Sequence, residues 1–334
     1  MKITGEINLH DSIIDIDIHN AREADINFGS NNLTLLNHKS KLFTSRDNSR
    51  IITNSEKIAE VYYHELADTM MDTFKPDIVL CHSHRIRSSN HLPSGERSEN
   101  VNLSETGKHF NLQENIPGPS PAAYRLRTVK NQCTVALSLH NDYHSAMEPY
   151  IKALILHSVG LTHSKLEKST RRFNTSRLWL NKVIDPNSIL HKDYTVRFAP
   201  GINKQSLADA DWSTVRTACY NSWRNLGPEH PDNQFMLEGS GNIDVLKTCE
   251  VRKIFEDSNY QILTIHRDCT QLIGKYYYYP NLQPDELILF NIWDSQKFYQ
   301  NKSWASIHTG FRLKEKGLPP RTSIDCNCLL GWLN

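Results

Sequence analysis

The chain has 334 residues, of which 38% are hydrophobic and 22% are charged, and its formal net charge is +1. This composition excludes an intrinsically disordered chain, because enough apolar residues are present to form a core. The balanced charge argues against a nucleic-acid partner, since proteins that bind nucleic acid usually carry a strong basic excess or a basic stripe.

The N-terminal segment lacks the pattern of an export signal. Its first twenty residues place Lys2, Glu6 and Asp11 among the apolar positions, so no continuous apolar run forms. No stretch of the sequence approaches the roughly 18 apolar residues that a membrane-spanning helix needs. We therefore expect a soluble, cytoplasmic protein without a membrane partner, whose seven cysteines are reduced thiols.

A first helix is predicted over residues 55–74. Thr53 and Glu56 fit a capping box at its start. Apolar residues then recur at helical spacing, namely Ile58, Tyr62, Leu66 and Met70. This pattern is typical of core packing.

The region from about Arg87 to Pro121 is predicted to be a long loop. It is polar, with Ser, Asn, Gly and Pro scattered through it. Long loops inside compact domains often serve as lids or binding segments. Residues 88–121 are therefore a candidate lid.

A second helix is predicted to follow Asp142. Ser145 and Glu148 fit a second capping box. The apolar stripe behind it consists of Met147, Ile151, Leu154 and Ile155. Core packing is again the expected role.

Strands dominate the remaining informative segments. The predicted strands are Cys133–Leu139, Glu286–Trp293 and Ser323–Leu333. Cys326 and Cys328 lie two apart on the last of them, so we expect both to pack inward as small hydrophobic residues. This pattern favours a mainly β fold, a β-sandwich or jelly roll with flanking α-helices. We expect a single domain over 1–334, with an N-terminal extension of about 1–125 packed on the core.

The segment after the first apolar strand carries a candidate metal-binding pair. His140 and Asp142 are two residues apart, so on an extended backbone both side chains point to the same side. They offer one neutral nitrogen and one anionic oxygen. With one more histidine they would form the facial triad of iron(II) oxygenases, which leaves positions open for a co-substrate and oxygen. Taken alone, such a pair also arises by chance.

The C-terminal region supplies the missing parts. His308 is followed thirteen residues later by Arg321, which opens a probable strand together with Ser323. Arginine matches a carboxylate with two charge-assisted hydrogen bonds, so Arg321 and Ser323 are candidates to hold the distal carboxylate of 2-oxoglutarate. A surface arginine after a Pro-Pro turn is the alternative. The order of these groups along the chain favours the metal-site interpretation.

Other histidines have secondary roles in this interpretation. His82 and His84 are two apart on a possible strand, and we expect them to line or support the pocket. His144 is a candidate to orient the metal ligands. His266 is expected to be a packed residue at a strand end.

Several motifs together resemble a known enzyme family. They include His82-Ser83-His84-Arg85, His140-Asn141-Asp142-Tyr143, Asn221-Ser222-Trp223-Arg224, Tyr277-Tyr278-Tyr279-Pro280, His308-Thr309-Gly310-Phe311 and Arg321-Thr322-Ser323-Ile324. This set is similar to the CmcJ/NvfI/AsaB hydroxylase/desaturase family and covers most of the chain. Departures from the family pattern stand at Asn225, Gly274 and Asn327.

The resemblance implies a double-stranded β-helix (jelly-roll, cupin-like) core and an Fe(II)/2-oxoglutarate-dependent dioxygenase. It implies that His140, Asp142 and His308 hold Fe(II), and that the enzyme uses O2 to hydroxylate or desaturate a small natural-product-like substrate. We also expect Asn221 and Arg224 near the co-substrate, although on a regular strand they would face opposite sides. Trp223 and the Tyr276–Tyr279 run are expected to be core residues.

Two other interpretations remain open. A cupin-like metalloenzyme that does not use 2-oxoglutarate could share the metal triad but would not need Arg321. A non-catalytic small-molecule binding protein would tolerate the loss of His140 or Asp142 without an effect on binding.

Overall fold

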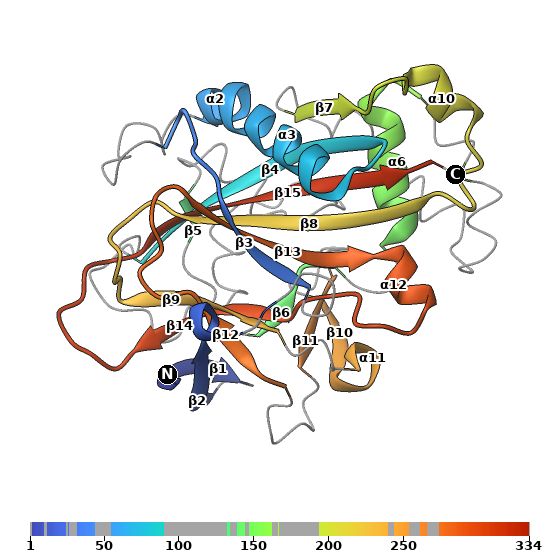
Figure 1. The fold of residues 1–334 in the computed structure, drawn as a ribbon. Coiled ribbons are helices and arrows are strands. Elements are labelled where there is room, and N and C mark those ends of the chain that lie inside the picture. Colours follow the sequence, from blue (N-terminus) through green and yellow to red (C-terminus); the bar gives the residue numbers. More distant parts are fainter. Residues whose placement is uncertain are drawn as a thin grey trace.

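The structure is a computed structural model in which two β-sheets pack face to face (Figure 1). It describes residues 2–9, 12–24, 26, 32–43, 55–89, 132–133, 139–143, 147–161, 166, 194–239, 244–253, 261–265 and 274–333. Within these residues the fold is mainly β, with helices on its flanks, as the sequence predicts.

The first sheet contains His140 and His308, the two histidines of the predicted metal site. Among the described residues it has eight strands, in the order β1 (Lys2–Leu9), β2 (Ser12–Asn20), β12 (Tyr276–Tyr278), β9 (Asn233–Glu238), β14 (His308–Leu313), β6 (His140–Asn141), β11 (Gln261–Ile265) and β10 (Cys249–Lys253). The strands β6 and β14 are therefore hydrogen-bonded neighbours, although His140 and His308 lie far apart in the sequence.

The second sheet faces the first. In the part of the chain that the structure describes, its strands are β3 (Leu33–Asn37), β13 (Glu286–Asp294), β8 (Arg216–Asn225), β15 (Thr322–Trp332), β4 (Ile78–Ser88) and β5 (Gln132–Cys133), with β7 (Tyr194–Phe198) paired to β4. The predicted strands 286–293 and 323–333 are confirmed as β13 and β15. Of the predicted strand 133–139, positions 134–138 lie outside the described residues.

The predicted helix over 55–74 is confirmed, but its hydrogen bonding changes along its length. It consists of α2 (Ser55–Lys57), a π-helical segment (Ile58–Tyr62) and α3 (Tyr63–Phe74). The four apolar residues of its predicted stripe are fully buried. They pack on the outer face of the second sheet, where Figure 1 shows α2 and α3 above β4 and β15. Thr53 of the expected capping box lies outside the described residues.

The predicted second helix is present as α6 (Glu148–Ser158), but Met147 stands at its N-cap, and Ser145 of the expected capping box lies outside the described residues. The helix starts after Met147, whose side chain makes no cap hydrogen bond. Glu148 instead pairs with Lys152 at 2.7 Å inside the protein, and Lys152 donates to the carbonyl of Trp212 at 2.5 Å. The acidic residue three positions after a serine therefore forms a buried ion pair, which the local sequence pattern does not reveal.

The remaining described helices are short. They are η1 (Ala21–Glu23), α10 (Lys204–Asp209), α11 (Val245–Thr248) and α12 (Ser295–Tyr299). No helix among the described residues is long and apolar enough to span a membrane.

Buried side chains form two clusters, one on each side of the second sheet. The cluster between the sheets includes the inner residues of β8 and β13 and most of α6. The outer cluster includes Cys326 and Cys328, so their predicted packing as small hydrophobic residues is confirmed.

The tyrosine run also packs as expected. Tyr276, Tyr278 and Tyr279 are buried, and Tyr277 is partly buried against the same core. The expected lid lies almost entirely outside the described residues. The division into a core and an N-terminal extension stays a prediction.

Candidate metal centre

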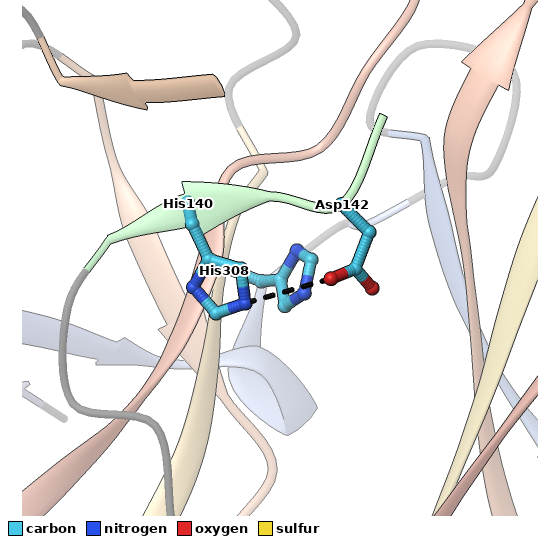
Figure 2. A group of neighbouring side chains, drawn as sticks. All are labelled: His140, Asp142 and His308. Carbon is cyan, nitrogen blue, oxygen red and sulfur yellow. Dashed lines mark ion pairs between the residues drawn. The ribbon is translucent and has the colours of Figure 1, made fainter. Parts of the chain in front are cut away.

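The short strand β6 and the residue after it bring His140 and Asp142 together. Nε2 of His140 lies 3.9 Å from Oδ1 of Asp142 (Figure 2). Between them, Asn141 donates from Nδ2 to the carbonyls of Tyr143 at 2.6 Å and Ile292 at 2.9 Å. Because Ile292 belongs to β13, the second bond fastens this segment to the opposite sheet.

His308 opens the neighbouring strand β14 directly opposite His140. The two imidazole ring centroids are 4.6 Å apart. Nδ1 of His308 lies 2.9 Å from the carbonyl of Ser306. Since a carbonyl oxygen only accepts, Nδ1 carries the proton and Nε2 keeps its lone pair, which is the arrangement of a metal-ligating histidine.

The three side chains converge on one buried point (Figure 2). One ligand atom from each lies within 4.8 Å of the others, and among the described residues this is the one group of His, Cys, Asp or Glu that could hold a metal ion.

The charge states of these side chains suit a metal cation. Burial and the neighbouring His140 lower the pKa of His308 to about 4, so its imidazole is neutral at pH 7. Burial opposes ionisation of Asp142, but Arg85 and the two histidines more than offset it and hold the pKa of this carboxyl well below its usual range. Two imidazole nitrogens and one carboxylate suit a divalent transition metal.

A small pocket, partly open to solvent, adjoins this point. Its lining combines aromatic and charged side chains: Arg87, His140, Asp142, Asn221, Trp223, Phe235, Phe290, His308, Thr309, Gly310, Arg321 and Asp325. The cavity thus connects the metal-ligand candidates with the arginine predicted to hold a co-substrate.

Arg321 is a buried cation in this cavity without a carboxylate at ion-pair distance among the described residues. Its guanidinium donates to the carbonyl of Gln234 at 3.1 Å and lies 5.5 Å from the ring centre of Trp223. Its Nε and the hydroxyl of Ser323 are both buried without a hydrogen-bond partner. Burial and the nearby Arg87 lower the pKa of Arg321 to about 9, which still leaves it charged at neutral pH.

Strand β8 contributes Asn221 and Trp223 to the cavity wall. Asn221 donates from Nδ2 to Oδ1 of Asn327 at 3.3 Å, and its own Oδ1 has no partner. Trp223 stacks on Phe235 with ring centroids 4.8 Å apart. The tryptophan is therefore a buried core residue, as expected, and a wall of the cavity as well.

Arg224 is not brought to the cavity. It lies on the opposite side of β8 and donates to the hydroxyl of Tyr62 at 3.3 Å, to the carbonyl of Pro284 and to His38. No bulge falls between it and Asn221 in the pairing of β8 with β15, so the two side chains face opposite ways. This placement overturns the expectation that Arg224 lies near the co-substrate.

His38, beside Arg224, should make the protein less stable in acid. Burial and then the Arg224 cation lower the pKa of His38 to about 4. An unfolded chain binds this proton near pH 6.5, so between the two values the unfolded state holds more protons and stability falls as pH falls. The free energy of unfolding should drop by about 2 kcal/mol from pH 7 to pH 5 on account of this residue. Denaturant unfolding of His38→Asn should show a shallower pH dependence than wild type; an equal slope would contradict this account.

The other histidines divide between the two faces of β4. His84 lies 2.9 Å from the hydroxyl of Tyr63 on the α3 side, so it does not line the cavity. His82 is buried but does not line the cavity either. His144 and His266 lie outside the described residues.

Sequence reasoning missed a charged group beside the metal ligands. Arg85 lies 3.6 Å from Asp142 and 3.8 Å from Asp325, and Asp325 pairs with Arg87 at 2.7 Å. No spacing rule predicts this group, because its members come from three separate segments. The one available signal was the position of Arg85 within the His-Ser-His-Arg motif.

Comparisons with known proteins agree with this geometry. A model of the oxidoreductase/YMDC permease-like domain matches residues 128–330. No curated protein matches the chain. The solved structures that it resembles include the iron and alpha-ketoglutarate-dependent endoperoxidase NvfI, with 13% identity, a TM-score of 0.60 and coverage of 100% of this chain and 99% of that one.

Two further structures of that protein match as well. A variant of it with one tryptophan replaced by phenylalanine is 14% identical with a TM-score of 0.58, and a different conformation is 15% identical with a TM-score of 0.56; each comparison covers 97% of this chain and 85% of that one. At such identity the likeness is one of fold, and it confirms the jelly-roll core. The resemblance to the CmcJ/NvfI/AsaB family predicted from the sequence is likewise confirmed.

Proposed function

The chain belongs to the oxidoreductase/YMDC permease-like family, and from this we propose that it is an Fe(II)/2-oxoglutarate-dependent oxygenase. We propose that it hydroxylates or desaturates an unactivated C–H bond of a small natural-product-like molecule. One observation carries the proposal: a buried His-Asp-His group shares its cavity with a buried arginine that has no carboxylate partner among the described residues.

The donor set fits iron(II). His140, Asp142 and His308 would hold the ion through two imidazole nitrogens and one carboxylate oxygen, all from the first sheet or the residue next to it. This 2-His-1-carboxylate set is typical of non-haem iron(II) oxygenases. Iron(II) with 2-oxoglutarate and O2 supplies the oxidising power for C–H chemistry, and the co-substrate leaves as succinate and carbon dioxide.

The remaining polar groups at the cavity fit a dicarboxylate. Arg321 would bind the distal carboxylate, since its Nε lacks a partner and its planar fork suits two parallel hydrogen bonds. Ser323, two residues after Arg321 on β15, is not among the cavity-lining side chains, but it would add a buried hydroxyl donor whose bonding capacity is also unused. Asn221 faces the same cavity, so we retain it as a co-substrate contact. Unpartnered buried polar atoms are costly, so several of them in one region support a missing polar ligand.

The aromatic residues of the cavity would shape the substrate's surroundings. Trp223, Phe235 and Phe290 line it. Such a wall excludes water from the reacting carbon and favours an apolar substrate.

The test is an anaerobic titration of the Fe(II)-loaded protein with 2-oxoglutarate, followed by visible absorption and calorimetry. We expect a weak visible charge-transfer band to grow in with saturable, one-to-one binding of the keto acid. Succinate, which lacks the keto group, is the matched control and should produce no band. A folded protein that binds iron but gives neither band nor heat would contradict the proposal and favour a cupin-like metalloenzyme that does not use 2-oxoglutarate.

A further inference from the structure

Strand β4 contains one residue more than its partner strand at the level of the metal site. Its pairing with β15 is regular from Ile78 to His82 and again from His84 to Ser88, but Asn327 faces His82 while its chain neighbour, Cys326, faces His84. Ser83 is therefore bulged out of the ladder. Its φ of +45° is one that residues other than glycine rarely adopt.

This bulge reverses the alternation of side chains for the rest of β4. A one-residue insertion moves every following side chain to the other face of a sheet. His84 consequently lies on the outer side against Tyr63. Arg85 and Arg87 lie on the inner side, where they meet the carboxylates of Asp142 and Asp325. Without the extra residue, Arg85 would face α3.

Arg85 connects the two carboxylates. Its Nη1 is 3.6 Å from Oδ1 of Asp142 and 3.8 Å from Oδ1 of Asp325. Asp325 is held in turn by Arg87, whose Nε is 2.7 Å from Oδ2. All four side chains are buried or nearly so, and two cations balance two anions. A buried group of this kind has one favoured arrangement, because moving any member leaves a charge unpaired.

We propose that Arg85 is a positioning residue for the metal site, aimed at Asp142 by the Ser83 bulge and kept in place by Asp325. Arg85 fixes the direction of the Asp142 carboxylate before a metal arrives. This inference rests on the proposed metal triad, but it does not depend on 2-oxoglutarate.

Removal of Arg85 should change metal affinity in opposite directions, depending on whether its charge or its orientation of Asp142 matters more. Coulomb repulsion alone disfavours a metal cation near Arg85, so Arg85→Met would tighten metal binding if charge were the main effect. If orientation of the ligand is the main effect, affinity falls, and groups that orient metal ligands are typically worth about 10- to 100-fold in metal affinity. The sign of the change therefore separates the two roles.

The experiment is a titration of the apo protein with Co(II), followed by its visible d–d absorption, which reports affinity and ligand geometry without catalysis. We expect Arg85→Met to weaken binding by about 10- to 100-fold and to alter the spectrum. Arg87→Met removes a cation of the same cavity whose ion pair is with Asp325, so it acts on Asp142 only indirectly and should lower affinity less than Arg85→Met does. Arg85→Lys keeps the charge without the planar fork, so it should restore affinity only in part.

Two changes at Ser83 test the bulge itself. Ser83→Gly keeps the extra residue and relieves the positive φ, so Co(II) binding should match wild type. Deletion of Ser83 turns Arg85 outward and should weaken binding as Arg85→Met does. If the deletion does not fold, as judged by circular dichroism, Arg85→Met and Arg85→Lys still decide the question.

The outcomes separate the inference from the function on which it rests. If wild type fails to bind one Co(II), or Asp142→Asn binds it like wild type, the metal-site proposal fails. If wild type binds and Asp142→Asn does not, yet Arg85→Met binds as tightly as wild type or more tightly with an unchanged spectrum, only the role of Arg85 is overturned.

Discussion

Replacement of Asp142 by Asn should abolish stoichiometric binding of a divalent metal while the protein stays folded. The change keeps the volume of the side chain but removes the anionic ligand, leaving the two imidazoles as the remaining ligands in a buried site. Neutral amides are weak ligands, and a cation in a low-dielectric interior needs a compensating charge. Arg85 would then face the site without its Asp142 partner, which further disfavours a cation there.

The measurement is titration with Fe(II) under anaerobic conditions, or with Co(II), followed by absorption and calorimetry. Asp294→Asn is the matched control. Asp294 is equally buried, but it caps α12 and pairs with Arg216 away from the cavity, so its replacement should leave metal binding unchanged. Retention of tight, one-to-one binding by Asp142→Asn would contradict the assignment of His140, Asp142 and His308 as the metal ligands.

Arg321→Met should weaken 2-oxoglutarate binding by on the order of 10²- to 10³-fold and leave metal binding intact, because truncating one partner of a buried charged pair typically costs about 2–5 kcal/mol. The free energy of unfolding of the free protein should change by less than about 1 kcal/mol, because two effects oppose each other. The variant loses the hydrogen bond to the carbonyl of Gln234, which destabilises the fold, but it also no longer buries a cation, which stabilises it. Calorimetric titration of the metal-loaded variant with 2-oxoglutarate measures the first effect, and denaturant unfolding of the apo protein the second.

Arg224→Met provides a control from the same sheet. Arg224 is as deeply buried as Arg321, but it serves the other face of β8, where it joins Tyr62, Pro284 and His38. Its loss should destabilise the fold and leave the affinity for 2-oxoglutarate unchanged. If both variants lost affinity equally, a general effect of destabilisation would explain the result, and Arg321 would have no special place in the pocket.

Features that depend on local periodicity could be predicted from the amino-acid sequence. A strand places every second residue on one side, so the spacing of His140 and Asp142 was enough to predict that they converge. The apolar spacing of residues 55–74 predicted a helix that lies against the sheet. The order of the motifs along the chain also anticipated that His308 and Arg321 would line one cavity, although they belong to strands of opposite sheets or their ends.

The side of a strand that faces the site could not be predicted where the alternation of side chains is interrupted or where its starting face is unknown. A regular strand would have put His82 and His84 on the same side, but the bulge at Ser83 separates them and turns Arg85 toward Asp142. The prediction that Arg224 lies near the co-substrate was wrong because β8 has no such bulge beside β15. Arg224 and Asn221 therefore stay on opposite faces of the sheet. The bulge brings Arg85 into contact with segments far apart in the chain, namely Asp142 and Asp325, and no local pattern of residues records these contacts.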